Sequence, residues 1–431
     1  MFTYYLDLAR RSLLRNKFLT MLMVLSIGLG IGASMTMITV LHVMSGNPLP
    51  GLSAQLYMPL LDPRTGTPDP GDVPDGFTWP DAMNLLRAQR ADGQAAMAAG
   101  VAVVHPAGAD HSAFFDSAQF TTSEFFTMFD VRFRAGGGWS AQQDDAHARV
   151  VVLNHALEHK LFGAASGLGQ ALRLNDTDFR VIGVLDGWHP QPAFFHQKGH
   201  HLYGSADQIF LPLKTALELH MPINGHFSCW GNGNNSRMSD QCSWVQFWVR
   251  LDNPLKALAY RHFLADYWHQ QQDHGRFPRK DSPPHLVGLM DWLAHEHIVP
   301  SNLSMQMWLA IGFLVVCMLS VVALLLAKFL RRSGEISVRR AMGAKRSDIF
   351  MQFGMEAAMI GVAGGLLGLG VAQLGLWSVR HRPEGYAHLA QMNMPMLVGT
   401  IVLAIVASVL AGCLPAWRAC QIAPALQLKT S

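Results

Sequence analysis

The chain has 431 residues, of which half are hydrophobic and only 15% are charged, whereas about 25% charged residues is usual for soluble domains. The formal net charge of +3 is too small for a general attraction to nucleic acid, and no basic patch occurs in the polar part of the sequence. Composition therefore excludes a nucleic-acid-binding protein and favours a membrane protein.

Four apolar runs are long enough to cross a bilayer, which takes about 20 residues. They lie at 18–44, 305–327, 353–379 and 395–417. The first run exceeds the apolar core of a cleaved signal peptide, about 7–15 residues, and no clear A-x-A cleavage site follows it. We therefore expect four membrane helices, the first of them uncleaved.

Arg and Lys residues cluster before the first run, between the second and third, and after the fourth. Short loops rich in these residues stay in the cytoplasm. The expected cytoplasmic segments are 1–17, 328–352 and 418–431, and the expected outside segments are 45–304 and 380–394. Arg380 and Arg382 in the last of these run against the rule. Both termini are therefore expected inside, in a multi-pass membrane protein.

The segment 45–304 is too long to be a linker and predicts a folded domain of mixed α/β type. Residues 149–153 are mostly β-branched and bounded by polar residues, which predicts a strand. The dipeptide Asn175-Asp176 between two apolar runs predicts a hairpin. Apolar spacing over 252–272 predicts a long helix.

Two of the five cysteines, Cys229 and Cys242, lie in the outside segment, where an oxidising compartment permits a disulfide. Closing this loop contributes on the order of 3 kcal/mol of stability. The alternative is that both are free thiols. Cys317 and Cys413 lie in membrane runs and Cys420 lies just beyond one, so these three are expected to be free.

Histidine is abundant, and a group of four lies close together in the outside segment: His189, His196, His200 and His201. Their spacing matches no known metal site, so no metal site is predicted. The sequence also lacks a G-x-S-x-G elbow and an H-E-x-x-H helix. No catalytic residue is therefore predicted.

Small residues recur at four-residue spacing in the apolar runs, where they let membrane helices approach closely. The glycine pairs are Gly28 with Gly32, Gly361 with Gly365, and Gly364 with Gly368. They fit either packing within one chain or a subunit interface. Glu356 is the carboxylate near a membrane helix, at the cytoplasmic edge. No run has the polar row that an aqueous path would need.

The segment Arg331 to Phe350, RRSGEISVRRAMGAKRSDIF, holds six Arg or Lys residues and two carboxylates. It fits a helix on the cytoplasmic surface, with Glu335 and Arg339 as an i,i+4 pair. Its basic residues would face either anionic lipid or a cytoplasmic protein.

Two stretches carry a family resemblance. GEISVRRAMGAKRSDIFMQFGMEAAMIGVAGGLLGLGVA resembles the core signature of the MacB/FtsX-type permeases, the type VII ABC transporters, and GCLPAWRACQIAPALQLK is similar to their closing segment. The order VVVLN, LFG and VIGV in the outside segment is similar to the MacB-type periplasmic core domain. The resemblance thus covers most of the chain. It implies two subdomains on a helical stalk, and we assign 252–272 to one half of that stalk.

The resemblance also implies that the basic segment is a coupling helix that contacts an ATPase. The matching residues, with the adjacent lysine, are Glu335, Ile336, Arg339, Arg340, Gly343, Ala344 and Lys345. The chain has no G-x-x-x-x-G-K-[ST] phosphate loop, and its first residue lies only 17 residues before the first run. We therefore expect a separate ATPase that uses ATP and Mg²⁺, with no cofactor bound by this chain and no catalytic activity of its own.

Further expectations follow from the family. Its members work as dimers, so a second copy or a paralogue is expected, in the bacterial inner membrane and in contact with its lipid. The implied activity is export of a periplasmic substrate such as an antibiotic, peptide or toxin by mechanotransmission, in MacB systems with a periplasmic adaptor and an outer-membrane channel. The alternatives are lipoprotein release and FtsX-like signalling.

Overall fold

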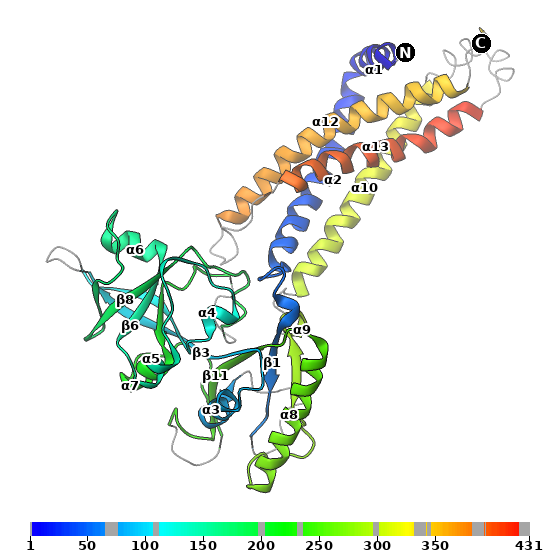
Figure 1. Cartoon of the computed structure of the whole chain (residues 1–431). Helices are drawn as coiled ribbons and strands as arrows, with labels where there is room; N and C mark the ends of the chain where they lie inside the picture. The colour runs from blue at the N-terminus through cyan, green and yellow to red at the C-terminus, as the bar shows by residue number, and fades with distance from the viewer. Residues whose placement is uncertain are drawn as a thin grey trace. The chain divides into compact units, whose positions relative to one another are not determined.

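The structure is a computed structural model in two compact units, Met1–Ser45 with Val299–Ser431, and Gly46–Ile298 (Figure 1). The described residues are 2–64, 76–106, 112–196, 203–230, 236–295, 301–331, 342, 346–381, 392 and 394–421. The first unit contains the apolar helices and the second is a mixed α/β domain.

The helical unit contains five long helices in the described residues. They are α1 (Phe2–Arg15), α2 (Lys17–Met44), α10 (Ser301–Arg331), α12 (Arg346–Arg380) and α13 (Met394–Gln421). Four of them, α2, α10, α12 and α13, are long and apolar enough to cross a membrane. The predicted fold class of four membrane helices with a large α/β domain after the first is confirmed. α12 begins at Arg346, earlier than the expected start at 353, because its polar first turns continue the helix.

Helix α2 shows why this unit packs as it does. Met23, Ile27, Ile31 and Met35 recur every four residues and are buried, which gives the helix one packed stripe. Phe18 on the same helix is 82% exposed. Such exposure of a large apolar side chain is expected where the surrounding solvent is lipid.

The second unit contains twelve strands in one sheet, within the described residues. They are β1 (Leu56–Leu60), β2 (Phe77–Thr78), β3 (Gly93–His105), β4 (Phe114–Thr121), β5 (Phe133–Gly136), β6 (Val150–Asn154), β7 (Ala171–Leu174), β8 (Thr177–Leu185), β9 (Ile209–Pro212), β10 (Ser228–Cys229), β11 (Cys242–Arg250) and β12 (His285–Gly288). The main path is β12-β1-β11-β3-β4-β9-β6-β8-β5. The β4–β9 and β6–β8 pairs are parallel, whereas the other paired strands are antiparallel.

Seven short helices and one long helix, α8, accompany these strands in the described residues. They are η1 (Ser53–Gln55), α3 (Trp79–Ala88), α4 (Phe125–Met128), α5 (Ala141–Asp145), α6 (His155–Phe162), α7 (Leu213–Glu218), α8 (Pro254–Asp273) and α9 (Leu289–His295). Figure 1 shows α5, α6 and α7 gathered with β6 and β8 at one end of this unit, and α3, α8 and α9 with β1 and β11 at the other.

Helix α8 corresponds to the long helix predicted over 252–272. Its Tyr260, Leu264 and Trp268 are buried in the same core cluster as Phe120 of β4 and Phe247 of β11. The assignment of this helix to a stalk is therefore wrong. Its aromatic side chains bury a large apolar area against the sheet, which a free-standing stalk helix would leave in water.

The predicted hairpin lies at β7 and β8. These strands pair antiparallel from Leu174 opposite Thr177, so Asn175 and Asp176 form the two-residue turn. Asn175 has a φ of 51°, the left-handed conformation that this type of turn needs and that Asn tolerates. The strand predicted at 149–153 is β6, shifted by one residue.

The other side of the sheet carries a group of packed rings that we name the aromatic layer. Its members are Phe125, Phe126, Phe129, Trp188, Phe194, Phe195, Phe210 and Trp248. Along β9, Leu211 belongs to the core cluster and Phe210 to the aromatic layer, because successive side chains of a strand point to opposite faces. The α/β unit therefore has a packed layer on each face of its sheet.

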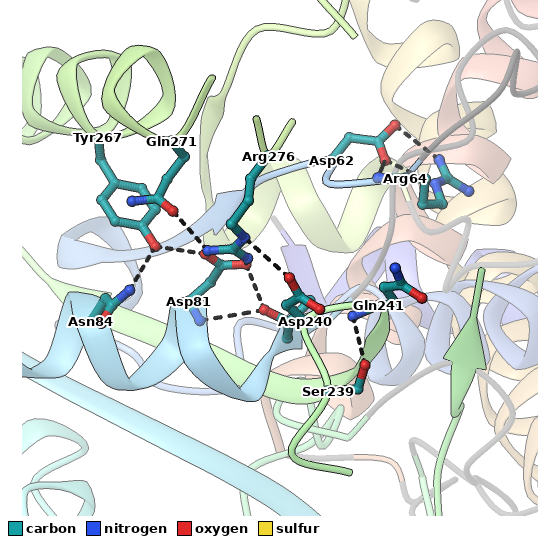
Figure 2. A network of polar contacts seen from close by, with 11 residues as sticks. Asp62, Arg64, Asp81, Asn84, Ser239, Asp240, Gln241, Tyr267, Gln271 and Arg276 are labelled. Atoms are coloured by element: carbon teal, nitrogen blue, oxygen red, sulfur yellow. Dashed lines mark hydrogen bonds and ion pairs between the residues drawn. The ribbon is translucent and has the colours of Figure 1, made fainter. Parts of the chain in front are cut away.

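A buried polar network connects α3 to α8 (Figure 2). Asp81 of α3 accepts hydrogen bonds from the Tyr267 hydroxyl at 2.6 Å and from Arg276 Nη2 at 2.7 Å. Arg276 Nε also lies 3.7 Å from Asp240, in the loop that the Cys229–Cys242 disulfide closes. Burial and the neighbouring Asp81 raise the pKa of Tyr267. The network ties this loop to the domain core.

The partly buried carboxyl of Asp116 on β4 should make the stability of the protein depend on pH. Burial raises its pKa from 3.8, and the nearby Asp207 adds to this, whereas the Ser117 N–H and Lys160 oppose it. A raised carboxyl pKa means that stability is lost as pH rises through the folded-state pKa. Asp116→Asn should therefore raise the unfolding temperature of the full chain at pH 7, by no more than a few degrees because solvent screens this half-exposed group.

The expected gain disappears as pH falls below 3.8, where the wild-type carboxyl is protonated in both states. Thermal unfolding at pH 7 and pH 3.5, followed by tryptophan fluorescence, measures this difference. Asp178→Asn is the control, because the Asp178 side chain is 67% exposed. A gain from Asp116→Asn that is equal at both pH values would contradict the burial argument.

Candidate functional site

The seven expected coupling residues, 335, 336, 339, 340 and 343–345, lie outside the described residues. Helix α10 ends at Arg331, before these residues, and α12 begins at Arg346, after them. The site that the structure does describe is therefore the ends of these two helices and what holds them together.

A buried ion pair joins them. Lys328 Nζ of α10 donates a hydrogen bond to Glu356 Oε2 of α12 at 2.7 Å, and the two side chains are 1% and 0% exposed. Among the described side chains of the four spans, Lys328 and Glu356 are the only charged ones that are buried. Charges inside membrane segments are rare and mark functional positions. Removing one partner of such a pair leaves an uncompensated charge in a medium of low dielectric constant.

From the sequence, Glu356 is expected at the cytoplasmic edge of a membrane helix, and residue 328 in a cytoplasmic segment. In the structure Glu356 lies eight residues inside the candidate span Asp348–Arg380, about 12 Å along the helix. Lys328 points into the bundle instead of toward a loop. Spacing within one segment does not reveal a pair formed between two helices, so the sequence offered no signal beyond the two charges themselves.

Small residues bring α13 against α12 beside this pair. The Ser408 hydroxyl of α13 donates a hydrogen bond to the Ala357 carbonyl of α12. A Cβ at Gly412 would lie 2.7 Å from the Ala357 Cβ and 3.8 Å from a Leu325 methyl of α10. Because the residue next to Glu356 is held by α13, the ion pair lies where three helices meet.

The six predicted glycines all lie at helix contacts within this chain. Gly28 and Gly32 of α2 face Leu367, Val371 and the Gly368 carbonyl of α12, and Gly364 and Gly368 face Ile27 and Ile31 of α2. Gly361 and Gly365 face Ala404 and Ser408 of α13. Of the two interpretations left open, the described structure therefore uses these glycines for packing within the chain.

The remaining candidate residues are placed as follows. Cys229 and Cys242 form a disulfide between β10 and β11, and Cys317 is a buried free thiol. His196 Nε2 lies 2.9 Å from Asp207 Oδ2, whereas His200 and His201 fall outside the described residues. In the part of the chain that the structure describes, no three His, Cys, Asp or Glu residues are grouped to hold a metal.

Comparison with known families fits this architecture. Residues 20–258 match the MacB-like periplasmic core domain, and residues 307–424 match the FtsX-like permease C-terminal domain. The first match alone covers more than half of the chain. The protein belongs to the MacB/FtsX-type family of ABC transporter permeases.

Individual relatives are distant. The chain is 24% identical to a pyoverdine export ATP-binding/permease protein PvdT of Pseudomonas syringae, over 76% of this chain and 44% of that protein. It is 23% identical to a macrolide export ATP-binding/permease protein MacB of Salmonella typhi, over 70% of this chain and 42% of that protein. The chain thus spans less than half the length of these relatives.

Among solved structures, the periplasmic region of MacB from Actinobacillus actinomycetemcomitans covers 56% of this chain, with 14% identity and a TM-score of 0.36. The extracellular domain of the noncanonic ABC-type transporter YknZ from Gram-positive bacteria covers 54%, with 13% identity and a TM-score of 0.35.

Proposed function

We propose that this chain is the membrane subunit that couples ATP hydrolysis by a separate ATPase to a conformational change of its α/β domain, for export of a periplasmic substrate such as an antibiotic, peptide or toxin. The names of the relatives, which export macrolides and pyoverdine, support an export role. The 431 residues contain no G-x-x-x-x-G-K-[ST] sequence, which supports assigning ATP and Mg²⁺ to the partner.

The Lys328–Glu356 ion pair carries the mechanical part of this proposal. It ties α10 to α12 three residues before α10 ends and ten residues after α12 begins. A force on the segment between them therefore acts on both helices together. The glycine contacts pass it to α2 and α13, because close-packed interiors transmit strain. Along the chain, α2 leads into the α/β unit, and the α/β unit leads back into α10.

The proposed arrangement places the α/β domain in the periplasm of a bacterial cell, with both termini and residues 328–352 in the cytoplasm. The Lys and Arg distribution supports this orientation. A second copy or a paralogue completes the permease dimer. A periplasmic adaptor and an outer-membrane channel then carry the substrate onward.

Charge reversal in the segment tests the coupling. Glu335→Arg and Arg339→Glu should each reduce stimulation of the ATPase by at least about fivefold, because like charges brought together at an interface cost several kcal/mol. Membrane insertion should be unchanged, since neither position falls within one of the four apolar runs of the sequence. ATPase rates of the reconstituted complex measure the effect.

Asp266→Arg, an exposed position on α8 in the α/β unit, is the matched control for a single charge reversal. Normal ATPase stimulation in both segment variants would contradict the assignment of 335 and 339 to the coupling surface. Glu335→Arg combined with Arg339→Glu separates a pairing between the two residues from contacts that each makes with the ATPase.

Affinity purification of the tagged chain from its native membranes tests the wider assembly. An ATPase together with a periplasmic adaptor supports export. An ATPase with a paralogous permease and no adaptor favours lipoprotein release or signalling. Recovery of no ATPase, under conditions that retain other ABC complexes, contradicts the proposed function.

A further inference from the structure

Three hydroxyl groups of α2 each have an acceptor on their own helix and a second acceptor on a neighbouring helix. Ser34, Thr36 and Thr39 are 2%, 8% and 0% exposed. Each hydroxyl donates a hydrogen bond to the carbonyl four residues earlier in α2, at 2.9, 2.9 and 2.8 Å. Hydroxyls that bond back in this way often bend a helix. The three hydroxyls are therefore satisfied whether or not another helix lies beside them.

The second acceptors belong to three other helices and are farther away. In the order Ser34, Thr36 and Thr39, they are the carbonyl oxygens of Ala310 on α10 and Ala372 on α12 and the sulfur of Met396 on α13, at 3.1, 3.5 and 3.7 Å. The bond within α2 is the shorter one in all three cases. Because long hydrogen bonds and bonds to thioether sulfur are weak, the contacts between helices break before those within α2.

The contacts around the ion pair are of a different kind. Ser408 of α13 donates to the Ala357 carbonyl of α12 at 2.5 Å, and Lys328 of α10 donates to Glu356 of α12 at 2.7 Å. Both bonds are short and both run between helices. The helices α10, α12 and α13 are therefore held to one another more firmly than α2 is held to any of them by its hydroxyls.

Glycines make the surfaces at the three hydroxyls smooth. Gly30 lies one turn before Ser34, and a Cβ there would lie 3.0 Å from the Cβ of Cys317 on α10. A Cβ at Gly375 of α12 would lie 2.6 Å from Thr36 Oγ1. Glycine also weakens the interior of a helix. This stretch of α2 therefore has little side-chain interlocking with its neighbours and bends more easily than an ordinary apolar helix.

We propose that Ser34, Thr36 and Thr39 form an adjustable joint, at which α2 shifts against α10, α12 and α13 during the ATP cycle. In the described arrangement each hydroxyl shares its proton between two acceptors. When α2 shifts, each hydroxyl keeps the acceptor on its own helix, so that no polar group is left unpaired in the membrane. The joint rests on the proposed function and adds to it the place where α2 moves relative to the other three helices.

A disulfide that fixes α2 to α10 tests the joint. Gly30→Cys places a second thiol beside Cys317, and a small backbone shift of about 0.5 Å brings the two Cβ atoms into the range of a disulfide. The full chain is reconstituted with the ATPase and oxidised, and mass spectrometry confirms the cross-link. Oxidation should lower ATPase stimulation at least about fivefold, and dithiothreitol should restore it, because the cross-link holds α2 in one position.

The same protein before and after reduction controls for folding. Gly30→Cys combined with Cys317→Ala has the same packing change without the cross-link, so oxidation should leave its ATPase stimulation unchanged. The wild type with and without dithiothreitol shows what reduction of the Cys229–Cys242 disulfide does by itself. Failure of Gly30→Cys to cross-link would contradict the α2–α10 contact on which the joint depends.

Labelling of Cys317 tests the hydroxyls without the ATPase. Cys317 is buried and faces α2, so N-ethylmaleimide reaches it when α2 shifts away. Changing Ser34→Ala, Thr36→Val and Thr39→Val together should speed this labelling at least about threefold, the effect of one typical hydrogen bond between membrane helices. Ser320→Ala, whose exposed hydroxyl bonds within α10, is the matched control and should label like the wild type.

The outcomes separate the joint from the proposed function. Normal ATPase stimulation by the cross-linked protein, or an unchanged labelling rate in the triple variant, would overturn the joint alone. A wild-type chain that fails to stimulate the ATPase would contradict the proposed function, and the joint with it. Reversible loss of stimulation on cross-linking, together with faster labelling in the triple variant, is the result that the joint requires.

Discussion

Lys328→Met should destabilise the helical unit by about 3–5 kcal/mol, because it takes the Lys328 ammonium group away from the buried Glu356 carboxylate. Glu356→Met should have an effect of similar size from the other side of the pair. Unfolding of the purified full chain in detergent measures the loss. In the reconstituted complex with the ATPase, both variants should also lose ATPase stimulation.

Two double variants separate stability from coupling. Lys328→Glu with Glu356→Lys restores an ion pair in reversed orientation and should recover much of the stability. Lys328→Met with Glu356→Met replaces the pair by apolar packing, which is often neutral or stabilising. If this apolar variant folds normally but fails to stimulate the ATPase, the pair acts in coupling. Wild-type stability of Lys328→Met would instead show that the pair does not hold α10 to α12.

Gly32→Leu should prevent α2 from docking on α12. Even the Cβ of an added side chain would lie 2.6 Å from the Val371 Cβ and 2.9 Å from the Gly368 carbonyl, and a backbone carbonyl cannot move aside as a side chain does. Gly32→Ala already overpacks this contact, which costs about 1–3 kcal/mol. The measurement is the unfolding temperature in detergent, together with the yield of folded protein.

Gly370 on α12 is the matched control, because a Cβ there meets nothing within 4 Å. Gly370→Ala should be neutral or stabilising by up to about 1 kcal/mol, since Ala favours a helix more than Gly does. Opposite signs for the two Gly→Ala changes are therefore expected. Equal effects would mean that the close approach of α2 and α12 is not what Gly32 provides.

Several features of the fold could be predicted because they depend on neighbours in the sequence. A membrane span needs only a run of apolar residues of sufficient length, and all four spans appear in the structure. The β7–β8 hairpin needs two turn residues between alternating strands, and Asn175-Asp176 forms that turn. The four-residue spacing of glycines marks one face of a helix, which is why all six candidates lie at helix contacts.

Other features depend on partners that are distant in the sequence. The repeat of Gly361 and Gly365 is like that of Gly364 and Gly368, yet the first pair faces α13 and the second faces α2. The apolar spacing over 252–272 predicted a helix, but only the sheet decided that Tyr260 and Trp268 would be buried in the domain core. Periodicity defines a face of an element and says nothing of what covers it.

The sequence by itself determined the class of this protein: four membrane helices, a large α/β domain after the first, and a basic segment between the second and third. Local composition and periodicity are sufficient for these. Only the tertiary structure decided that Lys328 and Glu356, 28 residues apart, are buried together, and that three hydroxyls of α2 meet three other helices. The reason is physical: burial and pairing of a charge depend on how helices and strands distant in the sequence pack, and no local pattern records that packing.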